Sequence, residues 1–171
     1  MPDLSLDTRP ERPGDAAAIE RLSERAFGPG RFARTAYRLR EGTTPLLSAS
    51  FVAFVATLIV GSVRMSPAMA GGRRVLVLGP LTVDPAFEGR GVGSMLMRAA
   101  IEAARRDGES LIFLVGDEPY YKRFGFRRAP ANGPKMPGPV DPARFLMLEL
   151  EEGAASDLRG ELRPLRAARR E

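Results

Sequence analysis

The chain of 171 residues contains no cysteine and no histidine. Without cysteine there are no disulfides and no thiol chemistry. The lack of histidine removes the commonest general base, and together with the lack of cysteine it argues against a zinc site. We therefore expect a protein that works without a metal ion.

Lysine is almost absent, since Lys122 and Lys135 are the only two, and the formal net charge of +5 comes from arginines spread along the chain. A basic balance can indicate a nucleic-acid partner. Nucleic-acid surfaces, however, interleave basic residues with aromatic ones that stack on bases, and no such pattern occurs here. We expect no nucleic-acid partner and assign the excess to a solvated surface and a small anionic ligand.

Charge is missing altogether between Gly42 and Val63, a run long enough to raise the question of a membrane span. Pro45, several hydroxyl residues and many β-branched residues favour paired strands instead. We predict antiparallel strands at Ser48–Val55 and Leu58–Ser66, turning at Ala56-Thr57. The N-terminus is acidic and polar, unlike a signal peptide, so we expect no membrane partner and a cytoplasmic protein.

Length and composition fit one globular domain, predicted at residues 1–152, followed by a basic, frayed tail at 153–171. The segment before the uncharged run predicts a strand around Leu4–Thr8, a helix that begins near Asp15, and a second helix at Phe32–Arg40.

The rest of the chain is organised around residues 75–106. A β-branched run at Val75–Val83 predicts a buried strand, which Asp84-Pro85 ends. A connector at Pro67–Gly72 would lead into this strand. A glycine-rich turn leads out of it into an amphipathic helix that ends at Arg106. That helix is expected to bury Val92, Met95, Leu96, Ala99, Ala100 and Ala103.

In the turn, Gly89, Gly91 and Gly93 alternate with Arg90 and Val92. Such a turn leaves successive N–H groups uncrowded at a helix N-terminus, which suits a phosphate or pyrophosphate. A tight turn without a ligand is the alternative. A Walker loop is excluded because no lysine follows the last glycine. The position of the turn, late in a short chain, argues against a dinucleotide-binding fold.

A second signal lies downstream, where a short strand at Ser110–Val115 precedes GDEPYYKRFGF at Gly116–Phe126. With both signals the chain resembles the GCN5-related N-acetyltransferase (GNAT) family, in particular its small bacterial YhbS-type branch. The family joins a strand ending in V-D-P to Q/R-x-x-G-x-G/A and later has Y-x-x-x-G-F. Val83-Asp84-Pro85, Gly91, Gly93 and Tyr121 with Gly125-Phe126 match it, over roughly residues 52–150.

The resemblance implies a mixed α/β fold with a mainly antiparallel sheet flanked by helices, splayed between the core strand and the next one. It implies acetyl-CoA as cosubstrate and Tyr121 as the general acid toward its sulfur. It also implies that backbone amides of the core strand hold the pantetheine arm and the thioester, and that the turn holds the pyrophosphate. The residues so implied are Leu81, Thr82, Val83, Gly89, Arg90, Gly91, Val92, Gly93 and Ser94.

Glu88 departs from the family pattern, which has Gln or Arg there, and it takes no role in this assignment. A carboxylate would repel a diphosphate unless it pointed away. The general base is left open among Asp117, Glu118 and a chain of water molecules. Tyr120 is expected to pack rather than act.

The expected function is acetyl transfer from acetyl-CoA to a primary amine of a small molecule or peptide. Two alternatives stay open: an acyl-CoA-binding sensor without catalysis, and an acyltransferase for a hydroxyl acceptor or a longer acyl chain. The long Pro/Gly-rich loop at Arg127–Arg144 is expected to be functional or mobile. No motif in the sequence identifies the acceptor. A homodimer is one possibility for the oligomeric state.

Overall fold

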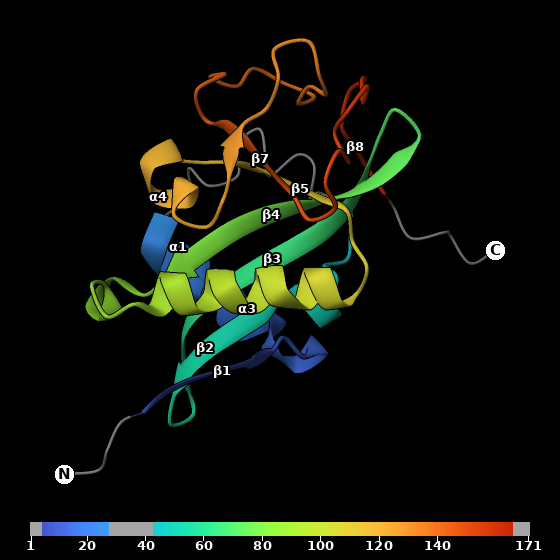
Figure 1. Ribbon diagram of the computed structural model, residues 1–171. Helices are drawn as coiled ribbons and strands as arrows, with labels where there is room; N and C mark the ends of the chain where they lie inside the picture. Colours follow the sequence, from blue (N-terminus) through green and yellow to red (C-terminus); the bar gives the residue numbers. More distant parts are fainter. Residues whose placement is uncertain (1–4, 28–42, 166–171) are drawn as a thin grey trace.

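A computed structural model describes residues 5–27 and 43–165 of the chain (Figure 1). Over these ranges the chain forms one eight-stranded sheet in the order β1-β2-β3-β4-β5-β7-β6, with β8 paired to β3. The strands are β1 Leu6–Pro10, β2 Phe51–Val55, β3 Leu58–Ala70, β4 Arg73–Val83, β5 Leu111–Val115, β6 Arg127–Arg128, β7 Phe145–Glu149 and β8 Arg163–Pro164.

The helices are α1 Ala16–Phe27, α3 Val92–Arg106 and α4 Glu118–Lys122, with short 3-10 turns η1 Pro13–Asp15, η3 Leu47–Ala49 and η4 Pro85–Phe87. In the part of the chain that the structure describes, β4 and β5 pair in parallel and the other strand pairs are antiparallel. The mixed, mainly antiparallel sheet flanked by helices is thus confirmed.

The hairpin of β3 and β4 is longer than the sequence pattern predicted. The expected connector at Pro67–Gly72 is wrong, because Pro67 pairs with Leu76 and β3 continues to Ala70. Only Gly71 and Gly72, both with positive φ, form the turn. Buried Ala68 and Ala70 keep the strand going, since both pack in the core beneath the C-terminal segment. At the other end, β2 begins at Phe51 rather than Ser48 because η3 precedes it.

Helix α3 lies across one face of the sheet, over β2, β3 and β4 (Figure 1). The contact is close: a Cβ on Gly61 would lie 2.7 Å from Val92 Cγ1 and 2.9 Å from Leu96 Cδ1. The predicted buried face is right for most positions, but Met95 is 36% exposed. The residues of α3 that are buried are Val92, Leu96, Met97, Ala100, Ile101, Ala103 and Ala104.

Helix α1 packs on β3 and β4 through Ile19 and Leu22. Since Gly61 faces α3 and side chains alternate along a strand, Ser62 and its partner Thr82 face the opposite side of the sheet. The expected helix start is confirmed in outline, with Asp15 closing η1 just before α1 and its carboxylate accepting the Arg12 N–H at 2.8 Å. The second helix expected at Phe32–Arg40 lies outside the described residues.

The C-terminal segment was expected to fray from residue 153, and this is wrong for residues 153–165. Four apolar side chains there are buried against β3, β4, β5 and β7, and β8 pairs with Ala68 and Met69 of β3. Without this cover, the apolar residues of β4 and β5 that face away from α3 would lie in water. The four buried residues are Ala154, Ala155, Leu158 and Leu162.

Candidate active site

The sheet opens between β4 and β5. Their parallel pairing is confined to Leu76–Ile112 and Val77–Phe113, although β4 runs on to Val83 and β5 to Val115. The register shift opposite β3, where Met65 pairs with Leu78 and Val63 with Leu81, places Gly79-Pro80 as an irregularity in β4. The expected splay between the core strand and the next is therefore present.

The edge of β4 that faces this opening carries unpaired amides. Asp84 N–H donates to Val60 C=O at 2.8 Å, so the peptide groups of Asp84 and Thr82 face β3. Backbone groups alternate along a strand, so the N–H groups of Leu81 and Val83 face the opening toward β5. The N–H group of Thr82 therefore points toward β3 and not into the opening, unlike the sequence-based expectation that it would meet a ligand. The Thr82 side chain is also fully buried.

The glycine turn after β4 is held by the side chain of Asp84. This carboxylate accepts the Ala86 N–H at 2.9 Å and lies 3.4 Å from Arg25 Nη2 of α1. Gly89 and Gly91 then adopt φ of +76° and +77°, which side chains other than glycine rarely take. The turn thus leads directly into α3, whose N-cap residue is Gly91, and no side chain caps the helix.

At this N-terminus the amides of Val92, Gly93 and Ser94 precede the first helical hydrogen bond, which Met95 N–H donates to Gly91 C=O at 3.0 Å. They line a cavity of about 360 Å³ with Gly89, Gly91 and Glu88. Arg123 Nη2 lies 3.1 Å from Ser94 Oγ on the far wall. Unpaired amides, the helix dipole and a guanidinium together favour an anion here.

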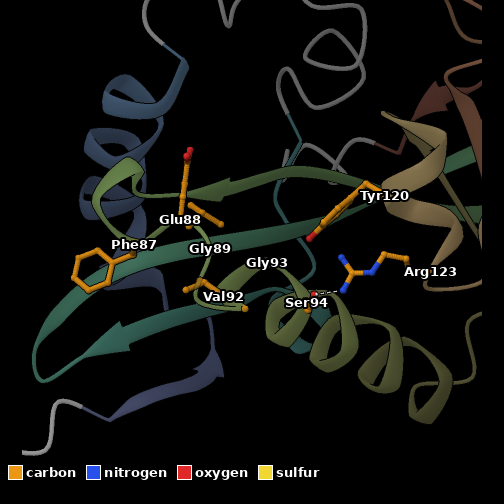
Figure 2. A pocket seen from close by; sticks show the side chains of 10 residues that line it. Phe87, Glu88, Gly89, Val92, Gly93, Ser94, Tyr120 and Arg123 are labelled. Atoms are coloured by element: carbon orange, nitrogen blue, oxygen red, sulfur yellow. Dashed lines mark hydrogen bonds between the residues drawn. The ribbon is translucent and has the colours of Figure 1, made fainter.

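Figure 2 shows how the side chains of this cavity are directed. Tyr120 and Arg123 project toward Gly93 and Ser94, whereas the Glu88 carboxylate points away from Ser94 and Arg123 (Figure 2). The departure of Glu88 from the family pattern therefore leaves the amide cluster free of a facing carboxylate. Arg90 also turns aside, with its guanidinium 5.2 Å from the Phe87 ring centre, and lies outside the set of residues that line the cavity.

A second cavity, of about 400 Å³, occupies the opening between β4 and β5. Tyr121 lines it, with its ring edge-on to Phe126 at 6.1 Å and against Gly116. Leu81 lines the same cavity. The structure therefore brings Tyr121 and a β4 amide to one cavity, as expected, and the turn residues to the adjoining one.

Tyr120 belongs to both cavities, which the sequence interpretation missed. A Cβ on Gly93 would lie 2.5 Å from the Tyr120 hydroxyl oxygen, so this side chain reaches the N-terminus of α3. Arg123, whose guanidinium is 5.4 Å from the Tyr120 ring centre, was also missed. The sequence contained a signal for this pair, because Tyr120 and Arg123 are three residues apart and would share one face of a helical turn. Helix α4 occupies residues 118–122, and Arg123 is its C-cap.

The two carboxylates considered as bases differ in their surroundings. Glu118 accepts a hydrogen bond from Arg128 Nε at 2.8 Å and is not among the residues that line either cavity. Asp117 lines the cavity between β4 and β5, at the N-cap of α4. Of the two, only Asp117 is placed to face a substrate there.

Comparison with known proteins shows which family has this architecture. Residues 48–128 match the family model described as Acetyltransferase (GNAT) domain. An uncharacterized N-acetyltransferase of Escherichia coli K12, YjhQ, is 33% identical over 125 residues, which cover 71% of this chain and 68% of that protein.

Among solved structures, the chain resembles the GNAT family N-acetyltransferase YhbS of Escherichia coli in complex with CoA. Their TM-score is 0.81 at 27% identity, over 96% of this chain and 92% of that one. A GNAT family acetyltransferase of Brucella melitensis in complex with acetyl-CoA gives a TM-score of 0.71 at 29% identity, over 94% and 96%.

No cluster of three or more metal-ligating side chains occurs within residues 5–27 and 43–165. No helix in those ranges is long and apolar enough to cross a membrane.

The family match, the relative and the sheet that splays between β4 and β5 agree: the chain belongs to the GCN5-related N-acetyltransferase (GNAT) family.

Proposed function

We propose that the protein transfers the acetyl group of acetyl-CoA to a primary amine. The observation that carries this proposal is the pair of adjoining cavities that share Tyr120. One is walled by the free amides of α3 and the other by the free edge of β4. Acetyl-CoA has the matching sequence of groups, with a diphosphate followed by an extended arm that ends in a thioester.

The diphosphate is bound at the N-terminus of α3. Its negative charge accepts hydrogen bonds from the amides of Val92, Gly93 and Ser94 and faces Arg123. Gly89 and Gly91 have no side chain to fill this space, and their positive φ disfavours other residues there. CoA and acetyl-CoA in the two similar bacterial structures support this choice of ligand.

The pantetheine arm lies along the open edge of β4. Its amide groups can pair with that edge as a short added strand would. The N–H groups of Leu81 and Val83 point into this space and donate to the arm and to the thioester oxygen, which they polarise. The splay between β4 and β5 provides the room for it.

Transfer then needs an attacking amine, a proton acceptor and a proton donor. The amine nitrogen forms a bond to the thioester carbon, a tetrahedral intermediate collapses, and the carbon–sulfur bond breaks. Asp117, directly or through water, takes one proton from the ammonium before attack. Tyr121 donates a proton to the leaving thiolate and regains one from the nitrogen, which leaves a neutral amide. Both residues line the cavity into which the arm leads.

A matched pair of glycine variants tests the diphosphate site. Gly91 and Gly108 have φ of +77° and +78°, and a Cβ on either would meet no atom within 4 Å. Alanine therefore imposes the same backbone strain at both ends of α3, of about 1 kcal/mol. Gly91→Ala is expected to lower the acetyl-CoA affinity at least tenfold in calorimetric titration, whereas Gly108→Ala keeps it.

Thiol release over a panel of amines then tests catalysis. Acetyl-CoA-dependent release that requires an amine supports the enzyme. Acetyl-CoA binding with no release on any amine would favour a sensor, and no binding of CoA or acetyl-CoA would contradict the site as a whole.

A further inference from the structure

Among the described residues, one carboxylate and one guanidinium line the cavity between β4 and β5, those of Asp117 and Arg144. The other described residues that line it are apolar, aromatic or glycine, and they include Phe27 of α1 and Pro80 of β4. A cavity with a single charge of each sign selects a ligand with both charges more strongly than one with either alone.

The two charges sit side by side on the sheet. Val115 pairs with Phe145, and Gly116 N–H donates to Arg144 C=O at 2.9 Å, so Arg144 lies opposite Gly116, the residue directly before Asp117. Both side chains are exposed. Despite this closeness they form no ion pair within 4.0 Å, with each other or with any other residue in the described ranges.

Neighbouring charges behave differently. Glu118 pairs with Arg128 at 2.8 Å, and Arg127 pairs with Glu149. These two pairs neutralise four of the ionised groups close to the cavity. Asp117 and Arg144 differ from them in that both line the cavity and neither has an ion-pair partner among the described residues.

On the basis of the proposed acetyl transfer, we propose that the acceptor is an amine that also carries a carboxylate, as an amino acid does. The ammonium lies against Asp117 and the carboxylate against Arg144, while the apolar remainder contacts Phe27 and Pro80. A carboxylate matches a single guanidinium in charge and in its fork-shaped hydrogen bonds. A phosphate dianion in place of the carboxylate would carry one negative charge more than the single Arg144 guanidinium can neutralise.

This arrangement serves the reaction directly. Asp117 holds the ammonium beside Tyr121 and Leu81, which line the same cavity, and takes the proton that must leave before the nitrogen can attack. The nitrogen then bonds to the thioester carbon, and the thiolate departs with a proton from Tyr121. The second proton of the nitrogen passes to the Tyr121 oxygen, which leaves a neutral amide and restores the tyrosine, and the carboxylate stays on Arg144. Arg144 is a binding residue in this scheme and carries no proton.

The test compares matched acceptors on the full-length protein. Leucine, leucinamide and isopentylamine share an apolar body and an amine, and only leucine has the carboxylate. Phenylalanine, phenylalaninamide and phenethylamine form a second set. Thiol release is measured over a range of pH, because the amines differ in basicity. We expect kcat/KM to be roughly 10- to 100-fold higher for the amino acid in at least one set, the range for one charge-assisted hydrogen bond.

Variants locate the effect. Arg144→Gln should remove the preference by raising KM for the amino acid, Arg144→Lys should restore part of it, and acetyl-CoA affinity should stay unchanged in both. Arg163→Gln, on β8 away from both cavities, is the matched control and should behave as the wild type.

Equal turnover of the three members of both sets, or a preference that survives in Arg144→Gln, would overturn the acceptor assignment and leave acetyl transfer standing. Absence of thiol release with any amine, neutral or charged, would instead overturn acetyl transfer and the acceptor assignment with it.

Discussion

The hydroxyl of Tyr120 occupies the space beside Gly93 that a side chain would need, because a Cβ on Gly93 would lie 2.5 Å from its oxygen. Gly93 has an ordinary helical φ, unlike Gly89 and Gly91. Its glycine is therefore required by the approach of α4 to the N-terminus of α3, rather than by the backbone of the turn. This contact joins the two halves of the motif that lie far apart in the sequence.

Gly93→Ala is expected to displace Tyr120 and to narrow the space at the amides of α3. Alanine gains about 1 kcal/mol of helix propensity over glycine, whereas overpacking costs about 1–3 kcal/mol, so the free energy of unfolding should fall by about 0–2 kcal/mol. The acetyl-CoA affinity should fall on the order of tenfold, as measured by calorimetric titration. Gly14→Ala, where a Cβ meets nothing, is the control. Unchanged affinity in Gly93→Ala would show that Tyr120 does not shape the site.

The two adjacent tyrosines should separate binding from chemistry. Tyr121→Phe removes the proposed proton donor and keeps the ring on Phe126, so kcat should drop by roughly 10²- to 10⁴-fold while acetyl-CoA affinity is kept. Tyr120→Phe removes a hydroxyl at the N-terminus of α3 and should act mainly on affinity. Thiol-release kinetics and titration on both variants check this. Full turnover by Tyr121→Phe would exclude it as the acid.

Thr82→Val should stabilise the protein without affecting its ligand. The hydroxyls of Ser62 and Thr82 are fully buried opposite each other, and neither has a hydrogen-bond partner. Removing one such group relieves a desolvation cost of about 1–3 kcal/mol. Urea unfolding should report a gain of that order, with acetyl-CoA affinity unchanged because the Thr82 peptide group faces β3. A loss of affinity would return Thr82 to the binding set.

Asp15 should make stability fall in acid. Its hydrogen bonds to Arg9, at 2.7 and 2.9 Å, lower the pKa of Asp15 below its ordinary value and raise the pKa of Arg9. A lowered carboxylate pKa stabilises the fold at pH values above the unfolded pKa of about 4, and this contribution is lost as the pH falls through the folded pKa.

Asp15→Asn should therefore lower the free energy of unfolding by about 1–3 kcal/mol at pH 7 and by less near pH 3. Urea unfolding of both proteins at the two pH values measures this difference. A gap between wild type and variant that is the same at both pH values would contradict the linkage.

The sequence indicated the strand, turn and helix at residues 75–106 because each element there is encoded locally. β-branched residues form the strand, Asp84-Pro85 ends it, and Gly89 and Gly91 permit the left-handed turn. The hairpin turn at Ala56-Thr57 and the downstream strand of β5 were predicted for the same reason. Errors arose where long-range pairing overrides local preference, as in the extension of β3 through Pro67 and in the buried segment at 153–165.

The amino-acid sequence by itself determined that this chain carries a glycine-rich turn at a helix N-terminus and a later tyrosine, because turn geometry and periodicity depend on neighbouring residues. The tertiary structure alone decided which groups meet. The N–H groups of Leu81 and Val83, rather than that of Thr82, face the opening between β4 and β5. The packing of α4 on α3 brings Tyr120 and Arg123 to the turn, and the register of β5 with β7 sets Arg144 opposite Gly116, next to Asp117. These choices depend on strand register and on the packing of elements distant in sequence, which no local pattern encodes.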